Sequence, residues 1–201
     1  MDEKREKREV RNTGYQVTVD KESRRVEGYA LLFESVSDGL PFREIIMRGS
    51  LDGVLEKSNI FALLDHDKSR GILARWKGAP ITLFLEIDTR GLKYWFDAPN
   101  TSLGDELLEC IHRKEITESS FSFIVSEDEW KKAEDGVWER KINKYEELFD
   151  ISPVYDAAFS KTSVYTRGRE QAEEELRKQE ERESACLLDE YYEKINKSLN
   201  I

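Results

Sequence analysis

Alternation of hydrophobic and polar residues predicts a series of short β-strands. In YQVTV, Tyr15, Val17 and Val19 share one side, and the turn-like DKES separates this segment from VEGYALLF, so we expect a β-hairpin. A second hairpin is predicted where ITLFLEI and LKYWF flank the turn DTRG. IFALLDHD indicates an apolar strand that ends in a polar cluster. A third hairpin, with its turn at 134–136, follows the serine-rich strand SSFSFIV.

Helical spacing is limited to a few segments. The hydroxyl of Ser50 can cap a short helix in LDGVLEK, and Ser102 can cap an amphipathic helix in SLGDELLECIHRK. Near the C-terminus a single apolar stripe predicts another amphipathic helix, which needs the core or a second chain as its partner. The residues of that stripe are Leu188, Tyr192, Ile195 and Leu199.

Charge density divides the chain into three parts. Nine of the first eleven residues are charged, which predicts a flexible N-terminal arm over residues 1–13. From Arg167 to Glu183, twelve of seventeen residues are charged, which predicts a linker or exposed helix. We therefore expect one globular domain over residues 14–166 and a charged helical tail over 167–201. The strands and few helices between them indicate an α+β fold, mostly antiparallel and barrel-like.

Composition narrows the class of partner. The formal net charge of -10 disfavours a broad electrostatic grip on nucleic acid or on an anionic membrane, so protein partners fit better. No apolar run approaches the roughly 20 residues that span a bilayer, and the start MDEKREKREVRN is too charged for a signal peptide. A soluble intracellular protein is expected. Cys110 and Cys186 give neither a disulfide framework nor a metal-ligand spacing, so we expect both to be reduced.

Two histidines carry most of the candidate chemistry. His112 falls in the last turn of a predicted helix, where the helix dipole favours a cation. His66 lies between Asp65 and Asp67 at a strand end, but one imidazole with two adjacent carboxylates lacks the spacing of a metal site. A serine nucleophile would need His66 as base and an acid to orient it; whether they meet in space is open. No phosphate-binding loop is present, and no cofactor is expected.

An ordered set of segments resembles the prohead proteases of tailed bacteriophages, the capsid maturation proteases. The segments are VEGYALLF, FREIIMRGSLDGVL, ALLDHD, ITESSFSFIV and LFDISPVYDAAF, within residues 24–160. This resemblance implies a herpesvirus-assemblin-like fold, an antiparallel β-barrel flanked by helices. It also implies a serine endopeptidase that cleaves the scaffold, or the scaffolding segment of the major capsid protein, and itself. Such an enzyme acts inside the assembling prohead in the host cytoplasm, and analogy with assemblin-like enzymes implies a homodimer.

The family's motifs also imply roles for particular residues. The nucleophile falls on Ser120, the general base on His66 and the orienting acid on Asp150, where Asp replaces the family's usual Glu. Asp156 and His112 are the alternatives for the third member. Two other functions remain open. One is a non-enzymatic scaffold or capsid-binding protein that keeps the protease fold. The other is a metal-dependent hydrolase centred on the DHD cluster.

Overall fold

The computed structural model describes residues 8–20, 23–37, 40–155, 174, 177 and 178, and for 13–16 only the backbone. Two compact units divide the chain, residues 1–164 and 165–201. In the second unit, Glu174, Arg177 and Lys178 are helical, and an ion pair joins Lys178 to Glu174 one turn away. The apolar stripe predicted from Leu188 onward lies outside the described residues. All elements below belong to the first unit.

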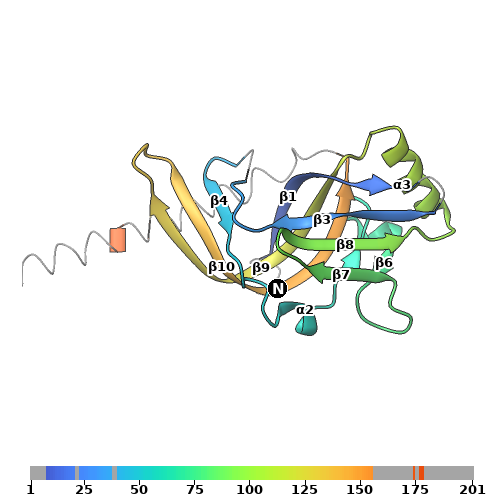
Figure 1. Cartoon of the computed structure of the whole chain (residues 1–201), viewed down its shortest axis with the longest axis horizontal. Helices are drawn as coiled ribbons and strands as arrows, with labels where there is room; N and C mark the ends of the chain where they lie inside the picture. Colours follow the sequence, from blue (N-terminus) through green and yellow to red (C-terminus); the bar gives the residue numbers. More distant parts are fainter. Residues whose placement is uncertain (1–7, 21–22, 38–39, 156–173, 175–176, 179–201) are drawn as a thin grey trace, which may run out of the picture. The chain divides into compact units, whose positions relative to one another are not determined.

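Two β-sheets form the body of this unit (Figure 1). The larger has the strand order β1 (Glu9–Gln16), β9 (Glu118–Lys132), β10 (Trp138–Val154), β5 (Phe61–Ala62) and β6 (Ala74–Arg75), with β4 (Arg43–Ile46) also paired to β10. The smaller has the order β2 (Thr18–Val19), β3 (Arg25–Leu32), β8 (Gly91–Asp97) and β7 (Leu83–Ile87). The helices are α2 (Val54–Lys57), α3 (Ser102–His112) and a 3₁₀ turn at Lys68–Arg70.

The fold is therefore α+β, rich in strands and poor in helices, as predicted. Most pairings are antiparallel, but β4 and β5 run parallel to β10. The described strands form two separate sheets, and their pairings do not close into the single barrel that we expected. β1 and β2 are consecutive along the chain yet belong to different sheets. Likeness to assemblin stays a prediction.

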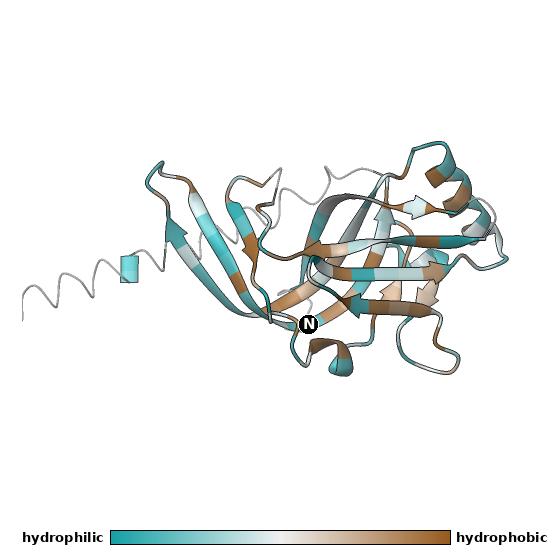
Figure 2. Ribbon diagram, viewed as in Figure 1, coloured by the Kyte–Doolittle hydropathy of each residue, from teal (hydrophilic) through white to brown (hydrophobic). Residues whose placement is uncertain are grey.

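All three predicted hairpins are present, but Tyr15 and Gln16, which were expected in the first, belong to β1 of the larger sheet. Strands β2 and β3, β7 and β8, and β9 and β10 pair in antiparallel fashion. The third is much longer than its sequence pattern indicated, because the pairing continues from Trp138 opposite Lys132 to Val154 opposite Glu118. Figure 2 shows mostly hydrophilic residues towards the tip of this hairpin, where β9 and β10 extend away from the smaller sheet. The base of the hairpin thus belongs to the core, and its tip to the solvent.

Both predicted helix caps shift, the first by three residues and the second by one. The first helix begins only at Val54, after Gly53 in the left-handed conformation (φ 70°), a conformation that glycine adopts without steric cost. Ser50, the expected cap, is buried, and its Oγ has no hydrogen-bond partner in the described part of the chain. For α3 the cap is Thr101, whose side chain accepts a hydrogen bond from the Gly104 amide, and Ser102 is the first helical residue.

One hydrophobic core joins the two sheets. Val26, Leu92 and Phe96 of the smaller sheet and Phe121 and Phe123 of the larger sheet are buried in the same cluster. Phe121 and Phe123 stack with ring centroids 4.8 Å apart. Each such side chain stabilises the fold by about 1.5–3 kcal/mol on burial. The core thereby fixes the base of β9, the strand that carries the candidate serine.

A buried ionic cluster anchors β1 to the larger sheet. The guanidinium of Arg11, 5% exposed, donates to both carboxylate oxygens of Glu44 at 2.6 and 2.8 Å and to Glu9 at 2.6 Å. Arg140 donates to the same two carboxylates. Burial alone would lower the pKa of Arg11, but these carboxylates outweigh that effect and raise the pKa above its ordinary value. The sequence pattern assigned residues 1–13 to a flexible arm, whereas the structure has a strand from Glu9, because the charges of Glu9 and Arg11 are paired within the fold.

Candidate active site

Ser120 lies in the middle of the larger sheet. It is on β9, opposite Asn12 of β1 and Ser152 of β10. Strand alternation directs Phe121 and Phe123 into the hydrophobic core, so Ser120 points to the other face. Its side chain is fully buried. Neighbouring strands on both sides therefore hold Ser120 in place.

The segment after β5 brings His66 to that same face. Backbone hydrogen bonds continue the parallel pairing with β10, from the Leu63 amide to the Ile151 carbonyl (3.2 Å) and from the Asp65 amide to the Pro153 carbonyl (3.0 Å). Asp65 and His66 then both adopt left-handed backbone angles, with φ of 52° and 60°. This conformation is uncommon outside glycine, and it is typical of functional sites when it is held by surrounding contacts.

The imidazole of His66 bridges Ser120 and Asp150. Its Nε2 lies 2.6 Å from Ser120 Oγ, and its Nδ1 lies 2.5 Å from Asp150 Oδ1. An ionised carboxylate only accepts hydrogen bonds, so it favours the tautomer with the proton on Nδ1. That tautomer leaves Nε2 as an acceptor for the Ser120 hydroxyl. The side chain of Asp150 reaches the ring although it is one methylene shorter than the glutamate that the resemblance implied for this position.

Asp150 is almost completely buried and is surrounded by donors. Oδ1 accepts a hydrogen bond from Ser152 Oγ at 2.8 Å, and Oδ2 contacts Ser122 Oγ and the guanidinium of Arg8. Ser122 faces Asp150 because the two are directly opposite across β9 and β10. Burial alone would raise the pKa of Asp150, but the hydrogen bond and charge of His66 and the two serine hydroxyls hold it below its ordinary value. The carboxylate therefore remains ionised at neutral pH.

Ser120 Oγ has a second hydrogen-bond partner. It donates to the backbone carbonyl of Arg11 on β1 at 2.9 Å. A hydroxyl has one proton, so with neutral His66 the proton goes either to Nε2 or to the Arg11 carbonyl. Attack on a substrate requires the first of these arrangements.

Ser119, for which the sequence suggested no role, is a core contact. Its hydroxyl lies 2.7 Å from the hydroxyl of Tyr94, and both side chains are fully buried. Gly28 passes close to this pair, since a Cβ at position 28 would lie 3.1 Å from the Tyr94 hydroxyl and 3.2 Å from Ser119 Oγ. The three serines of ESSFSF thus contact different groups: Tyr94, His66 and Asp150.

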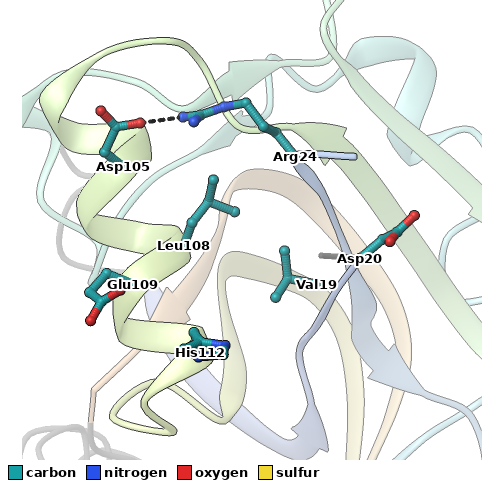
Figure 3. A pocket seen from close by; sticks show the side chains of 7 residues that line it. All are labelled: Val19, Asp20, Arg24, Asp105, Leu108, Glu109 and His112. Atoms are coloured by element: carbon teal, nitrogen blue, oxygen red, sulfur yellow. Dashed lines mark ion pairs between the residues drawn. The ribbon is translucent and has the colours of Figure 1, made fainter. Parts of the chain in front are cut away.

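Of the two alternatives to Asp150, the structure describes His112, which lies away from Ser120 and His66. His112 ends α3 and lines a pocket of about 450 Å³ together with Val19, Asp20 and Glu109 (Figure 3). An ion pair from Arg24 to Asp105 borders that pocket at 2.8 Å, and the side chains of Ser120, His66 and Asp150 do not line it. Asp156 lies outside the described residues.

The DHD cluster does not gather into a metal-binding arrangement. Asp67 turns away to cap the following 3₁₀ turn, where its side chain accepts hydrogen bonds from the Ser69 amide and hydroxyl. Among the residues that the structure describes, no group of three or more His, Cys, Asp or Glu side chains could hold a metal ion. Within the same residues, none of the helices has the length and apolar character needed to cross a membrane.

Three contacts of Asp150, with Arg8, Ser122 and Ser152, were missed in the sequence. Arg8 lies in the charged run that indicated a flexible arm, so nothing marked it as part of a site. Ser152 follows Asp150 by two positions on a strand, a spacing that places both side chains on one face. That spacing was the available signal for Ser152; Arg8 had none.

Residues 9–177 match the family of proteins described as caudovirus prohead serine proteases. No curated protein matches the chain, and no solved structure does.

Proposed function

This chain belongs to the caudovirus prohead serine protease family and is a serine protease of phage capsid maturation; we propose that Ser120 is its nucleophile, His66 its general base and Asp150 the acid that orients His66. The observation that carries this proposal is the contact of one imidazole with both partners, at 2.6 Å to Ser120 Oγ and 2.5 Å to Asp150 Oδ1. Such a chain of three groups is what nucleophilic catalysis by serine requires.

In the proposed reaction, His66 Nε2 takes the Ser120 proton as Oγ attacks the carbonyl carbon of the scissile peptide bond. Asp150 keeps the proton of His66 on Nδ1 and stabilises the imidazolium that forms. The imidazolium then protonates the leaving amine, which departs and leaves an acyl ester on Ser120. A water molecule, deprotonated by His66, hydrolyses that ester and restores the hydroxyl.

The proposed substrates are proteins of the capsid assembly. They are a separate scaffold protein or the scaffolding segment of the major capsid protein, and the protease itself, inside the prohead in the host cytoplasm. Extended and accessible segments suit a protease, because the backbone around the scissile bond must enter the site. A homodimer and self-cleavage in the charged terminal segments belong to the same proposal.

Burial of Ser120 favours a second candidate, a non-enzymatic assembly protein with the same fold. The hydroxyl is fully buried and shares its proton with the Arg11 carbonyl. For catalysis, the residues that cover Ser120 must move enough for a substrate carbonyl to approach. A non-enzymatic protein needs no such opening.

Co-expression with the capsid protein of the same phage separates these candidates. We expect wild-type protein to convert the capsid protein to smaller fragments, measured by intact-protein mass spectrometry, and Ser120→Ala to leave it whole. Ser126→Ala is the matched control, because Ser126 is an exposed serine of the same strand. Fragments that persist with Ser120→Ala but vanish with a chelator would indicate a metal-dependent hydrolase instead. A wild-type protein that cleaves nothing would favour the assembly protein.

A further inference from the structure

Arg8 reaches the candidate site from outside the sheet. Its Nη2 donates to Ser122 Oγ at 2.6 Å and forms an ion pair with Asp150 Oδ2. The guanidinium also lies over the ring of Phe149, 4.8 Å from its centroid. The Arg8 side chain is 38% exposed, whereas Asp150 is 1% exposed. Three contacts thus fix a partly solvated cation against a buried carboxylate.

We propose that Arg8 is a positioning residue for the protease reaction, acting through Asp150; the proposal rests on the assignment of Ser120, His66 and Asp150 above. The two carboxylate oxygens have different partners. Oδ1 contacts the donors His66 and Ser152, while Oδ2 contacts Arg8 and Ser122. Guanidinium groups donate and never accept, so Arg8 holds Oδ2 on its own side and leaves Oδ1 directed at the imidazole.

Charge is the second part of its role. Without Arg8, neutral His66 and ionised Asp150 together carry one buried negative charge, which is costly unless it is paired. Arg8 compensates that charge in the resting enzyme. The same cation repels the imidazolium formed during the reaction, so it also limits how strongly the pair binds a proton.

The position of Arg8 depends on the buried cluster that anchors β1. Glu9 and Arg11, the next charged residues along the chain, pair with Glu44 and Arg140 inside the fold. These contacts fix the backbone of β1 directly after Arg8. Integrity of the first strand is thereby coupled to the orientation of the proposed catalytic acid.

The test uses the full chain and a fluorophosphonate, a probe that needs no natural substrate because the oxygen of an activated serine attacks its phosphorus atom and displaces fluoride. Second-order rate constants for labelling of Ser120 are measured as a function of pH for wild type, Arg8→Ala, Arg8→Gln and Arg8→Lys. Arg43→Ala is the matched control, since Arg43 is a similarly exposed arginine paired with Asp135 at 2.5 Å. Unfolding by urea reports any loss of fold.

We expect Arg8→Ala and Arg8→Gln to lower the plateau rate at least tenfold, which corresponds to about 1.4 kcal/mol in the activation barrier, because Oδ2 of Asp150 then loses the donor that holds it away from His66. In both variants the acidic limb of the pH profile moves to higher pH, since the imidazolium is no longer repelled. Arg8→Lys retains the charge and keeps the limb at the wild-type position. Asp65 and Asp67 flank His66 in every variant, so a difference in the acidic limb between variants reports the effect of Arg8 alone.

The proposal would be overturned if Ser120 were labelled at the wild-type rate in the Arg8 variants and the acidic limb of the pH profile were unshifted. A loss of rate with an unshifted limb would also overturn it, since that is what a merely structural contact produces. Failure of the proposed function has a different signature, because then the wild-type protein is not labelled at Ser120 at all.

Discussion

Replacement of Asp150 by asparagine tests the candidate site atom by atom. The two side chains have nearly the same shape, but asparagine has one acceptor oxygen and one NH₂ group where aspartate has two acceptors. Ser122 and Ser152 can rotate their hydroxyls to suit either group. Arg8 cannot, because a guanidinium only donates. We therefore expect the amide oxygen to face Arg8 and the NH₂ group to face His66.

An NH₂ group at the position of Oδ1 reverses the tautomer of His66. With a donor near Nδ1, that nitrogen must accept, so the ring proton moves to Nε2, which lies 2.6 Å from Ser120 Oγ. A protonated Nε2 cannot take the hydroxyl proton. In the well-studied Ser-His-Asp template the equivalent change lowers kcat by about 10⁴-fold, or about 5 kcal/mol in the activation barrier. The same loss is expected here.

The assay is the rate of fluorophosphonate labelling of Ser120, followed by mass spectrometry at neutral pH. Adding Arg8→Ala to Asp150→Asn frees the amide to turn its oxygen towards His66, so we expect the double variant to recover at least part of the lost rate. Labelling of Asp150→Asn within tenfold of wild type would refute the assigned role of Asp150. A double variant slower than Asp150→Asn would refute the proposed orientation of the amide.

Three further outcomes follow from buried polar groups of the fold and of the site. Ser119→Ala removes the partner of the Tyr94 hydroxyl and should lower the free energy of unfolding by about 1–3 kcal/mol in urea titrations. Adding Tyr94→Phe should restore part of the lost stability, and the absence of any rescue would contradict the contact. Glu44→Ala leaves Arg11 and Arg140 buried without that carboxylate and should cost about 3–5 kcal/mol by the same measurement; a loss below 1 kcal/mol would show that the cluster is not a stabilising unit. Burial alone would raise the pKa values of Glu9 and Asp150. In the folded state Arg140 and Arg11 nevertheless lower the pKa of Glu9, and His66 and two serine hydroxyls lower the pKa of Asp150. Their contribution to stability is complete above the ordinary carboxyl pKa of about 4 and is lost as the pH falls below it, so the urea midpoint should drop from pH 5 to pH 3, and a flat profile would argue against it.

The parts of the fold that the sequence predicted are those with local patterns. Alternating residues and turn signals identified the hairpins of β2 with β3, β7 with β8, and β9 with β10. Long-range pairing has no such signal. Parallel pairing of β5 with β10, which brings the segment before His66 beside Asp150, joins residues some ninety positions apart. Local spacing cannot encode that register.

The charged residues near the N-terminus were assigned to a flexible arm for a related reason. A run such as EKREVR reads as solvated chain, because a buried charge is rare unless it is paired, and the partners are distant in sequence. Arg11 is paired with Glu44, and Arg8 with Asp150. The resemblance to prohead proteases pointed to Ser120, His66 and Asp150 through family motifs, whereas the donors around Asp150 became visible only in three dimensions.

The most direct measurement of the central claim is the location of the fluorophosphonate adduct in the full chain, by tandem mass spectrometry of its peptides. We expect the adduct on Ser120 in the wild-type protein and its loss in His66→Ala, with Ser126→Ala unchanged. An adduct on another residue, or equal labelling of wild type and His66→Ala, would contradict the assignment of Ser120 as a nucleophile activated by His66.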